Sequence, residues 1–184
     1  MRIDQRIIPR FGKIIEGEMF GKSKGFKGKE DMYLPYDDSV FIVKKCQPSP
    51  ESIKPFAQAL RNKLLEKFNM AHDDEKIKFF TAVDSPLDLF HGVDGFIELK
   101  VGLTTYLRVT YDITANPQKN TCSADILIDV PESGLEINTK EFEQKVEKIA
   151  TETREILKSK IEKLYAKVNK QNNEHPVGKI NVWA

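Results

Sequence analysis

The sequence is poor in cysteine and contains no long apolar run. Its two cysteines, Cys46 and Cys122, are far apart and form no CxxC spacing. This argues against a disulfide framework and against a zinc site built on cysteine, so we expect two reduced structural thiols. No stretch of about 18 uncharged apolar residues occurs, and the N-terminal region has no apolar run of signal-peptide length. We therefore expect a cytoplasmic protein with no membrane partner.

Net charge is also nearly absent. The 29 basic and 28 acidic residues leave a formal charge of +1, which argues neither for nor against a nucleic-acid partner. Hydrophobic residues make up 40% of the chain and charged residues 31%, as in globular rather than disordered proteins. A chain of 184 residues is close to the usual size of one domain. We expect a single domain over residues 1–184 that ends in a tail over 171–184.

Basic side chains are concentrated in residues 1–30, which also contain the glycine-rich stretch GKSKGFKGKE. This composition predicts a basic N-terminal segment that is partly mobile. One interpretation is a solvated loop. The other is an arm that follows the phosphates of DNA or RNA. The candidate nucleic-acid-binding residues, one of them from a later turn, are Lys22, Lys24, Lys27 and Lys119.

Hydrophobic periodicity predicts the secondary structure. Apolar residues at helical spacing predict helices over 53–69 and 139–170. Runs of β-branched and aromatic residues predict strands over 39–43, 76–83, 93–101, 106–114 and 124–130, and DSPLDLFHG is expected to be a loop. We expect an α/β fold with a central mixed or antiparallel sheet. A hairpin formed by 93–101 and 106–114 lies at its core, and the two helices flank it.

The predicted hairpin has an apolar and a polar face. Alternation places Asp94 and Glu98 on one face of the first strand, and it places Arg108 and Asp112 on the matching face of the second. A three-residue connection over 102–104 fixes the register, with Asp94 opposite Asp112 and Glu98 opposite Arg108. The second pair is an ordinary cross-strand ion pair.

The pairing of Asp94 with Asp112 needs an explanation, because like charges directly opposite one another destabilise a sheet. Two carboxylates at such a distance share a proton or hold a cation. Mg²⁺ or Mn²⁺ would remove the repulsion, since hard cations prefer carboxylate ligands. The alternative is a different register that leaves both aspartates in water at strand ends. Asp84 and Asp88 extend the predicted acidic face, Asp125 and Asp129 flank it on the next strand, and all four favour the metal site.

The segment HGVDGFIE over 91–98, followed by the hairpin and by VTYDIT over 109–114, resembles the PD-(D/E)XK nuclease superfamily. In that superfamily a helix precedes a strand with an aspartate, and a hairpin leads to a second strand with an acid, one intervening residue and a lysine. A further helix and strand usually follow. The resemblance covers about residues 50–170 in element order. It implies a restriction-endonuclease-like fold that uses Mg²⁺ or Mn²⁺ to hydrolyse phosphodiesters.

The resemblance also implies roles for individual residues. Asp94 would be the first metal ligand, and Asp112 would be the acid of the second strand and a further ligand. Glu66, on the preceding helix, would fill the acidic helix position often seen in the superfamily. With Thr114, which occupies the position of the superfamily's lysine, these residues form the predicted catalytic site.

Thr114 cannot supply the positive charge of a lysine. Lys100 or Lys119 could take this role if the fold brings one of them close. The string ELK over 98–100 also has the spacing of an acid and a lysine, but it would need an earlier acid such as Asp84 as the first ligand.

Three functional hypotheses follow. The first is a metal-dependent nuclease that acts on DNA or RNA. The second is a catalytically inactive domain of the same architecture that binds nucleic acid or protein. The third is an interaction module whose long Lys- and Glu-rich helix makes a homo-oligomer or partner interface. Metal binding separates the first two hypotheses from the third, and cleavage separates the first from the second.

Overall fold

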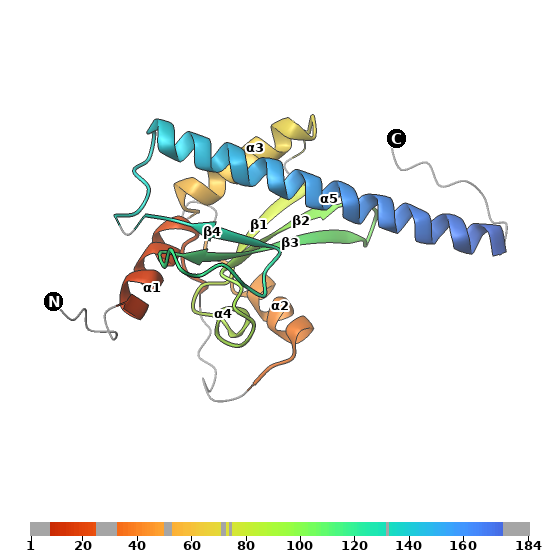
Figure 1. The fold of residues 1–184 in the computed structure, drawn as a ribbon. Coiled ribbons are helices and arrows are strands. Elements are labelled where there is room, and N and C mark those ends of the chain that lie inside the picture. Colours follow the sequence, from red (N-terminus) through yellow and green to blue (C-terminus); the bar gives the residue numbers. More distant parts are fainter. Residues whose placement is uncertain are drawn as a thin grey trace.

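A four-stranded mixed sheet with helices on both of its faces forms the centre of the structure (Figure 1). This computed structural model describes residues 8–24, 33–49, 53–70, 73, 75–131 and 133–174, with side chains from 13 to 170. The strands are β1 Ile77–Thr81, β2 Gly95–Lys100, β3 Tyr106–Thr114 and β4 Ile126–Asp129. The helices are α1 Ile8–Met19, α2 Tyr36–Lys45, α3 Pro55–Lys67, α4 Pro86–His91 and α5 Lys140–Glu174. The predicted α/β class is confirmed, with a mixed sheet flanked by helices.

The hairpin of β2 and β3 has the predicted register. Glu98 lies opposite Arg108, and Lys100 lies opposite Tyr106. β1 pairs antiparallel with the other edge of β2, and β4 pairs parallel with β3. The connection over 115–125 contains no helix, and α5 follows β4. The order of elements after β3 therefore differs from that of the PD-(D/E)XK superfamily, in which a helix usually comes before the strand.

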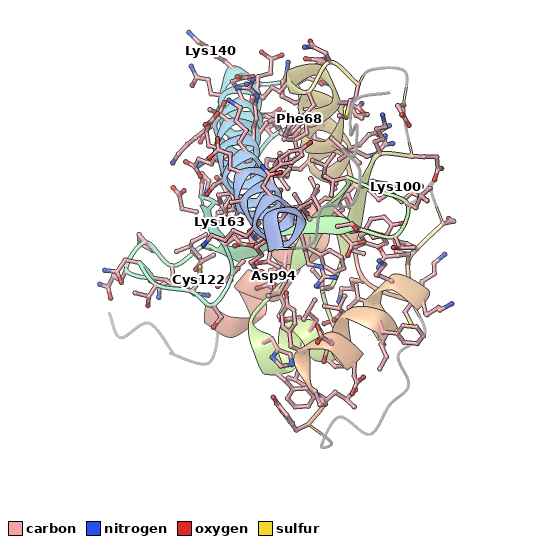
Figure 2. All side chains as sticks on the ribbon, turned by 90° about the vertical axis from the view of Figure 1, so that its right-hand side faces the viewer. Phe68, Asp94, Lys100, Cys122, Lys140 and Lys163 are labelled. Carbon is pink, nitrogen blue, oxygen red and sulfur yellow. The ribbon has the colours of Figure 1, made fainter. Side chains whose placement is uncertain are left out.

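Two apolar clusters cover the two faces of the sheet. The larger cluster packs α1, α3 and α5 against one face, through residues such as Ile97, Val109 and Tyr111. The smaller cluster packs α2 and α4 against the other face, through residues such as Phe80 and Phe96. Figures 1 and 2 show α3 and α5 on one side of the sheet and α2 and α4 on the other. Alternate residues of β2 thus point into different clusters, as the period of two predicts.

Residues 39–43, predicted to be a strand, lie in helix α2, so this prediction is wrong. The β-branched and aromatic residues of SVFIV favour a strand by propensity. In the helix, however, Val40 and Val43 are buried on one side, while Phe41 is 63% exposed. The first turn contains two aspartates and the last turn two lysines, and each charge is favourable at its end of the helix dipole. Packing and end charges outweigh propensity here.

Two helices occupy segments for which no regular structure was predicted. α1 lies within the basic N-terminal segment, of which 1–7 and 25–30 are outside the described residues, as are 175–184 of the predicted tail. α4 replaces the loop predicted for DSPLDLFHG. The Ser85 hydroxyl caps α4 by accepting the backbone N–H of the second and third helical residues, and Gly92 ends it at a left-handed φ of 63°.

α5 corresponds to the helix predicted over 139–170 and continues to Glu174. Its first half packs on the sheet through Phe142, Val146, Ile149 and Leu157, none of them more than 7% exposed. Its second half continues beyond the sheet (Figure 1). Within the described residues, neither α5 nor any other helix is long and apolar enough to cross a membrane.

We expect Leu157→Ala to lower the free energy of unfolding by about 2–5 kcal/mol, because truncating a fully buried side chain leaves a cavity. Leu103→Ala is the matched control. Leu103 is 93% exposed at the tip of the hairpin, so its truncation should change stability by less than about 0.5 kcal/mol. Chemical denaturation measures both values. Equal losses for the two variants would contradict the packing of α5 on the sheet.

Candidate metal centre

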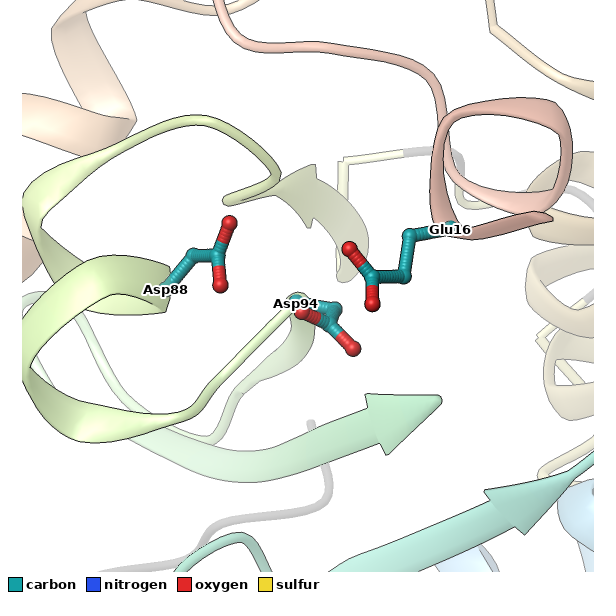
Figure 3. A group of neighbouring side chains, drawn as sticks. All are labelled: Glu16, Asp88 and Asp94. Carbon is teal, nitrogen blue, oxygen red and sulfur yellow. The ribbon is translucent and has the colours of Figure 1, made fainter. Parts of the chain in front are cut away.

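Three carboxylates converge at the end of the sheet where β2 begins. Glu16 comes from α1, Asp88 from α4, and Asp94 from the residue just before β2. One carboxylate oxygen of each residue lies within 4.8 Å of one from each of the other two. Figure 3 shows the three side chains directed toward one another from these separate elements. Glu16 and Asp88 are partly buried, and Asp94 is buried.

Asp94 is held in place by the backbone of β3. Its own N–H donates to the carbonyl of Tyr111 at 2.8 Å, which extends the β2–β3 ladder by one bond. Its Oδ2 accepts the N–H of Ile113 at 2.6 Å. The residue is only 4% exposed, so the carboxylate has little access to water. The start of β2 therefore places a rigidly held carboxylate inside the protein.

Local backbone structure places the other two acids. Asp88 lies in the first turn of α4, and its Oδ2 accepts the N–H of Asp84 at 2.9 Å. Asp84 itself has a left-handed φ of 63°, which turns the chain from β1 into α4. Glu16 lies one helical turn before Phe20, whose N–H donates to the Glu16 carbonyl at 2.9 Å. The helical ends of α1 and α4 thus direct both side chains toward Asp94.

The three carboxyl groups have raised pKa values. Burial, followed by the negative charge of Asp88, raises the pKa of Glu16 to about 7. Burial, followed by the charge of Glu16, raises the pKa of Asp94 to about 8. The pKa of Asp88 is also raised, again mainly by burial. Burial and mutual repulsion therefore disfavour the ionised form of all three carboxyl groups, and a bound cation would favour it.

The acids of this cluster differ from the other buried carboxylates of the sheet. Glu98 is 3% exposed, and it pairs with Lys44 at 2.6 Å and with Arg108 at 2.7 Å. Asp112 is 6% exposed and pairs with Lys119 at 2.6 Å. Among the described residues, by contrast, no basic side chain lies within ion-pairing distance of the cluster of Glu16, Asp88 and Asp94. A buried carboxylate without a cation is costly, which makes this cluster an exception.

The two acids of the predicted metal pair, Asp94 and Asp112, bind different partners. The register that aligns Asp94 with Asp112 is present, but the carboxylate of Asp94 turns to the N–H of Ile113. The carboxylate of Asp112 turns instead to Lys119. A backbone donor and a lysine thus satisfy the two acids separately, and their pairing as ligands of one metal ion stays a prediction. Asp112 still contributes to the charge that raises the pKa of Asp94.

Two further predicted residues, Glu66 and Thr114, are not members of the cluster. Glu66 is on the surface of α3, where its side chain is 60% exposed and pairs with Lys63 at 2.7 Å. Glu16 of α1, and not Glu66, supplies a helical acid to the cluster. Thr114 is 8% exposed, and its hydroxyl accepts the N–H of Asn116 at 3.0 Å, so it forms the turn after β3.

Three lysines pair with aspartates that neighbour the cluster in the fold. Lys22 pairs with Asp84 at 2.8 Å, and Lys13 approaches the same carboxylate at 3.9 Å. Lys119 pairs with Asp112 from the 115–125 connection. The side chains of Lys13 and Lys22 are more than 60% exposed, and that of Lys119 is 37% exposed. Of the other predicted nucleic-acid-binding lysines, Lys24 is exposed after α1, and Lys27 is outside the described residues.

Sequence reasoning missed Glu16 because α1 was not predicted. Ile15 and Met19 are buried at helical spacing and Phe20 follows them, and this short apolar pattern was the available signal. Comparisons of the chain with protein families, with curated proteins and with solved structures find no match.

The raised pKa values predict that the metal-free protein loses stability as the pH rises. In the unfolded chain these carboxyl groups titrate near their ordinary values, whereas in the folded protein Glu16 and Asp94 titrate near 7 and 8. The stability that these two carboxyl groups contribute is therefore fully present below their pKa values in the unfolded chain. It is lost as the pH rises through their pKa values in the folded protein. We expect the melting temperature in chelator to fall between about pH 5 and about pH 9, and to fall less for Asp94→Asn. Glu66→Gln is the control, and an identical slope for Asp94→Asn and wild type would contradict the assignment.

Proposed function

We propose that the protein is a metal-dependent nucleic-acid hydrolase in which Glu16, Asp88 and Asp94 hold a Mg²⁺ or Mn²⁺ ion. One observation carries this proposal. Asp94 is 4% exposed and faces two other carboxylates, while the other buried acids of the sheet face lysine or arginine. A divalent cation would supply the charge that is missing from this one cluster.

The donor set suits a hard divalent cation. All three residues offer carboxylate oxygens, which Mg²⁺ and Mn²⁺ prefer to nitrogen or sulfur ligands. The hydrogen bond from Ile113 orients the carboxylate of Asp94, which lies within the cluster. When bound, such an ion lowers the pKa of a coordinated water and offsets the charge on a phosphodiester.

Lys119 supplies the positive charge that the second-strand motif lacks at Thr114. Its ammonium group is 2.6 Å from Asp112, which lies on β3 next to the residue whose N–H binds Asp94. We assign Lys119 to hold the scissile phosphate or the attacking water beside the acids. Lys13 and Lys22, exposed beside Asp84, would bind the flanking phosphates of the strand.

The PD-(D/E)XK resemblance supports this proposal in part. An aspartate before β2, an acid on β3 and a mixed sheet flanked by helices agree with it. The helical acid comes from α1 instead of α3, the lysine comes from a loop, and β4 comes before α5. These differences favour the binding-module alternative, in which the domain keeps the architecture and binds nucleic acid or protein without cleaving it.

Metal binding is the first test. We expect Mn²⁺ in excess over its dissociation constant to raise the melting temperature of wild type, since an ion that binds only the folded state adds about 2.7 kcal/mol at 100 times that constant. Asp94→Asn and Glu16→Gln should lose this shift, and without metal they should be as stable as wild type or more so, because repulsion is removed. Glu66→Gln should keep the full shift. If the melting temperature of wild type does not change with Mn²⁺ or Mg²⁺, the proposed metal site is wrong.

Cleavage is the second test. We expect Mn²⁺-dependent nicking of supercoiled plasmid or cleavage of single-stranded RNA, and we expect Lys119→Met to slow it by about 100-fold or more while the Mn²⁺ affinity is retained. Lys160→Met is the matched control. It also removes a lysine from an aspartate, because Lys160 pairs with Asp125 at 3.0 Å, but this pair is outside the acidic cluster. Metal binding without cleavage of either substrate would favour the binding module, and equal rates for the two lysine variants would exclude the role of Lys119.

A further inference from the structure

Gly95, the first residue of β2, has no room for a side chain. A Cβ atom placed on it would lie 2.8 Å from Cδ2 and 3.0 Å from Cε2 of Phe20, and 3.1 Å from Cζ of Phe79. Real Cβ atoms essentially never show a contact of 2.8 Å, so some atom would have to move, and the other two distances are also tighter than most real Cβ contacts. The Phe20 ring therefore lies directly on the backbone of β2, beside Asp94.

Position 95 needs a glycine because a side chain has no room there, and not because of the backbone conformation. Gly21, Gly92 and Gly134 have a positive φ, but Gly95 has none and continues the regular pairing of the sheet with Thr81 and Tyr111. An alanine could adopt this backbone. Glycine within a strand often marks a place where another part of the chain approaches closely, and here that part is the end of α1.

The Phe20 ring cannot move aside to make room. It is 1% exposed, and its centroid lies 4.8 Å from that of Phe79, 5.9 Å from that of Tyr111 and 6.2 Å from that of Phe56. A ring enclosed on several sides transmits a displacement to its backbone. A side chain at position 95 would therefore push the end of α1 away from β2.

The end of α1 is also fixed by hydrogen bonds. The Thr81 hydroxyl, opposite Gly95 in the sheet, donates to the carbonyl of Gly21 at 2.6 Å. The N–H and the hydroxyl of Ser23 both donate to the carbonyl of Val83, at 3.1 Å and 3.0 Å. Phe20, between these contacts and the helix, is one turn from Glu16. The separation of α1 from β2 thus determines where the Glu16 carboxylate lies.

We propose that Gly95 is a positioning residue for the metal centre: its missing side chain lets Phe20 lie against β2, and this contact brings Glu16 of α1 to Asp94. The inference rests on the proposed function, because its expected effect is a change in metal affinity. The packing of Phe20 on Gly95 is independent of that function and is tested separately.

The experiment compares Gly95→Ala, Phe20→Leu and the double variant with wild type. We expect Gly95→Ala to weaken Mn²⁺ binding by about tenfold or more, because α1, which carries the ligand Glu16, is displaced. Leucine at position 20 leaves room for the added methyl group, so the double variant should bind Mn²⁺ more tightly than Gly95→Ala alone. Gly102→Ala is the matched control, since a Cβ there lies no closer than 3.5 Å to any atom. It should bind Mn²⁺ as wild type does.

Amide hydrogen exchange at Phe20 and Gly21 in chelator provides the second readout. Gly95→Ala should speed exchange at these amides, and Phe20→Leu should reverse part of that change. Mn²⁺ affinity and exchange rates in Gly95→Ala equal to those of wild type would overturn the inference, as would a double variant no better than Gly95→Ala. If wild type binds no Mn²⁺ but the exchange pattern follows this expectation, the packing of α1 stands and the metal proposal fails.

Discussion

The antiparallel pairing of β2 with β3 is the interaction on which the rest of the structure depends. It directs alternate residues to opposite faces, so that Ile97 joins the larger apolar cluster while Phe96 joins the smaller one. It also places Glu98 beside Arg108, and one bond beyond the strand it fixes Asp94 through Tyr111 and Ile113. A shift of one residue would exchange the two faces and bury the wrong side chains. The position of Asp94 in the acidic cluster therefore follows from the register.

This part of the fold could be predicted from the sequence because its signals are local. The alternation in β2 and β3 and the short connection between them define the register, and the apolar stripe defines α5. Where packing decides, prediction failed. The run SVFIV favours a strand by propensity, yet α2 forms because Val40 and Val43 can be buried together against Phe80. The cluster itself depends on α1 reaching β2, a contact between distant segments for which the sequence offers no local signal.

Asp94 and Glu98, two buried carboxylates four residues apart, differ in how their charges are neutralised. Glu98 and Asp94 are both almost fully buried, but Glu98 is neutralised by Lys44 and Arg108, which themselves lie over aromatic rings. Pairing and hydrogen bonding of this kind offset much of the cost of burying a charge. Asp94 has one backbone donor and two acidic neighbours, and the cost appears as its raised pKa. Basic side chains thus offset the cost of burying the charge of Glu98, whereas no basic side chain offsets it at Asp94 among the described residues.

Within the part of the chain that the structure describes, the cluster of Glu16, Asp88 and Asp94 lacks a paired positive charge, and a cation bound there would link α1 to β2 and α4. Phe20, Thr81 and Val83 hold the end of α1 on the sheet, while the charge of Glu16 opposes Asp88 and Asp94 across the same contact. Under the proposed function, an ion that binds all three acids converts this repulsion into attraction, so its binding free energy adds to the docking of α1. Under the same function, the packing of Phe20 on Gly95 would hold Glu16 close enough to Asp94 for a cation to bind both carboxylates.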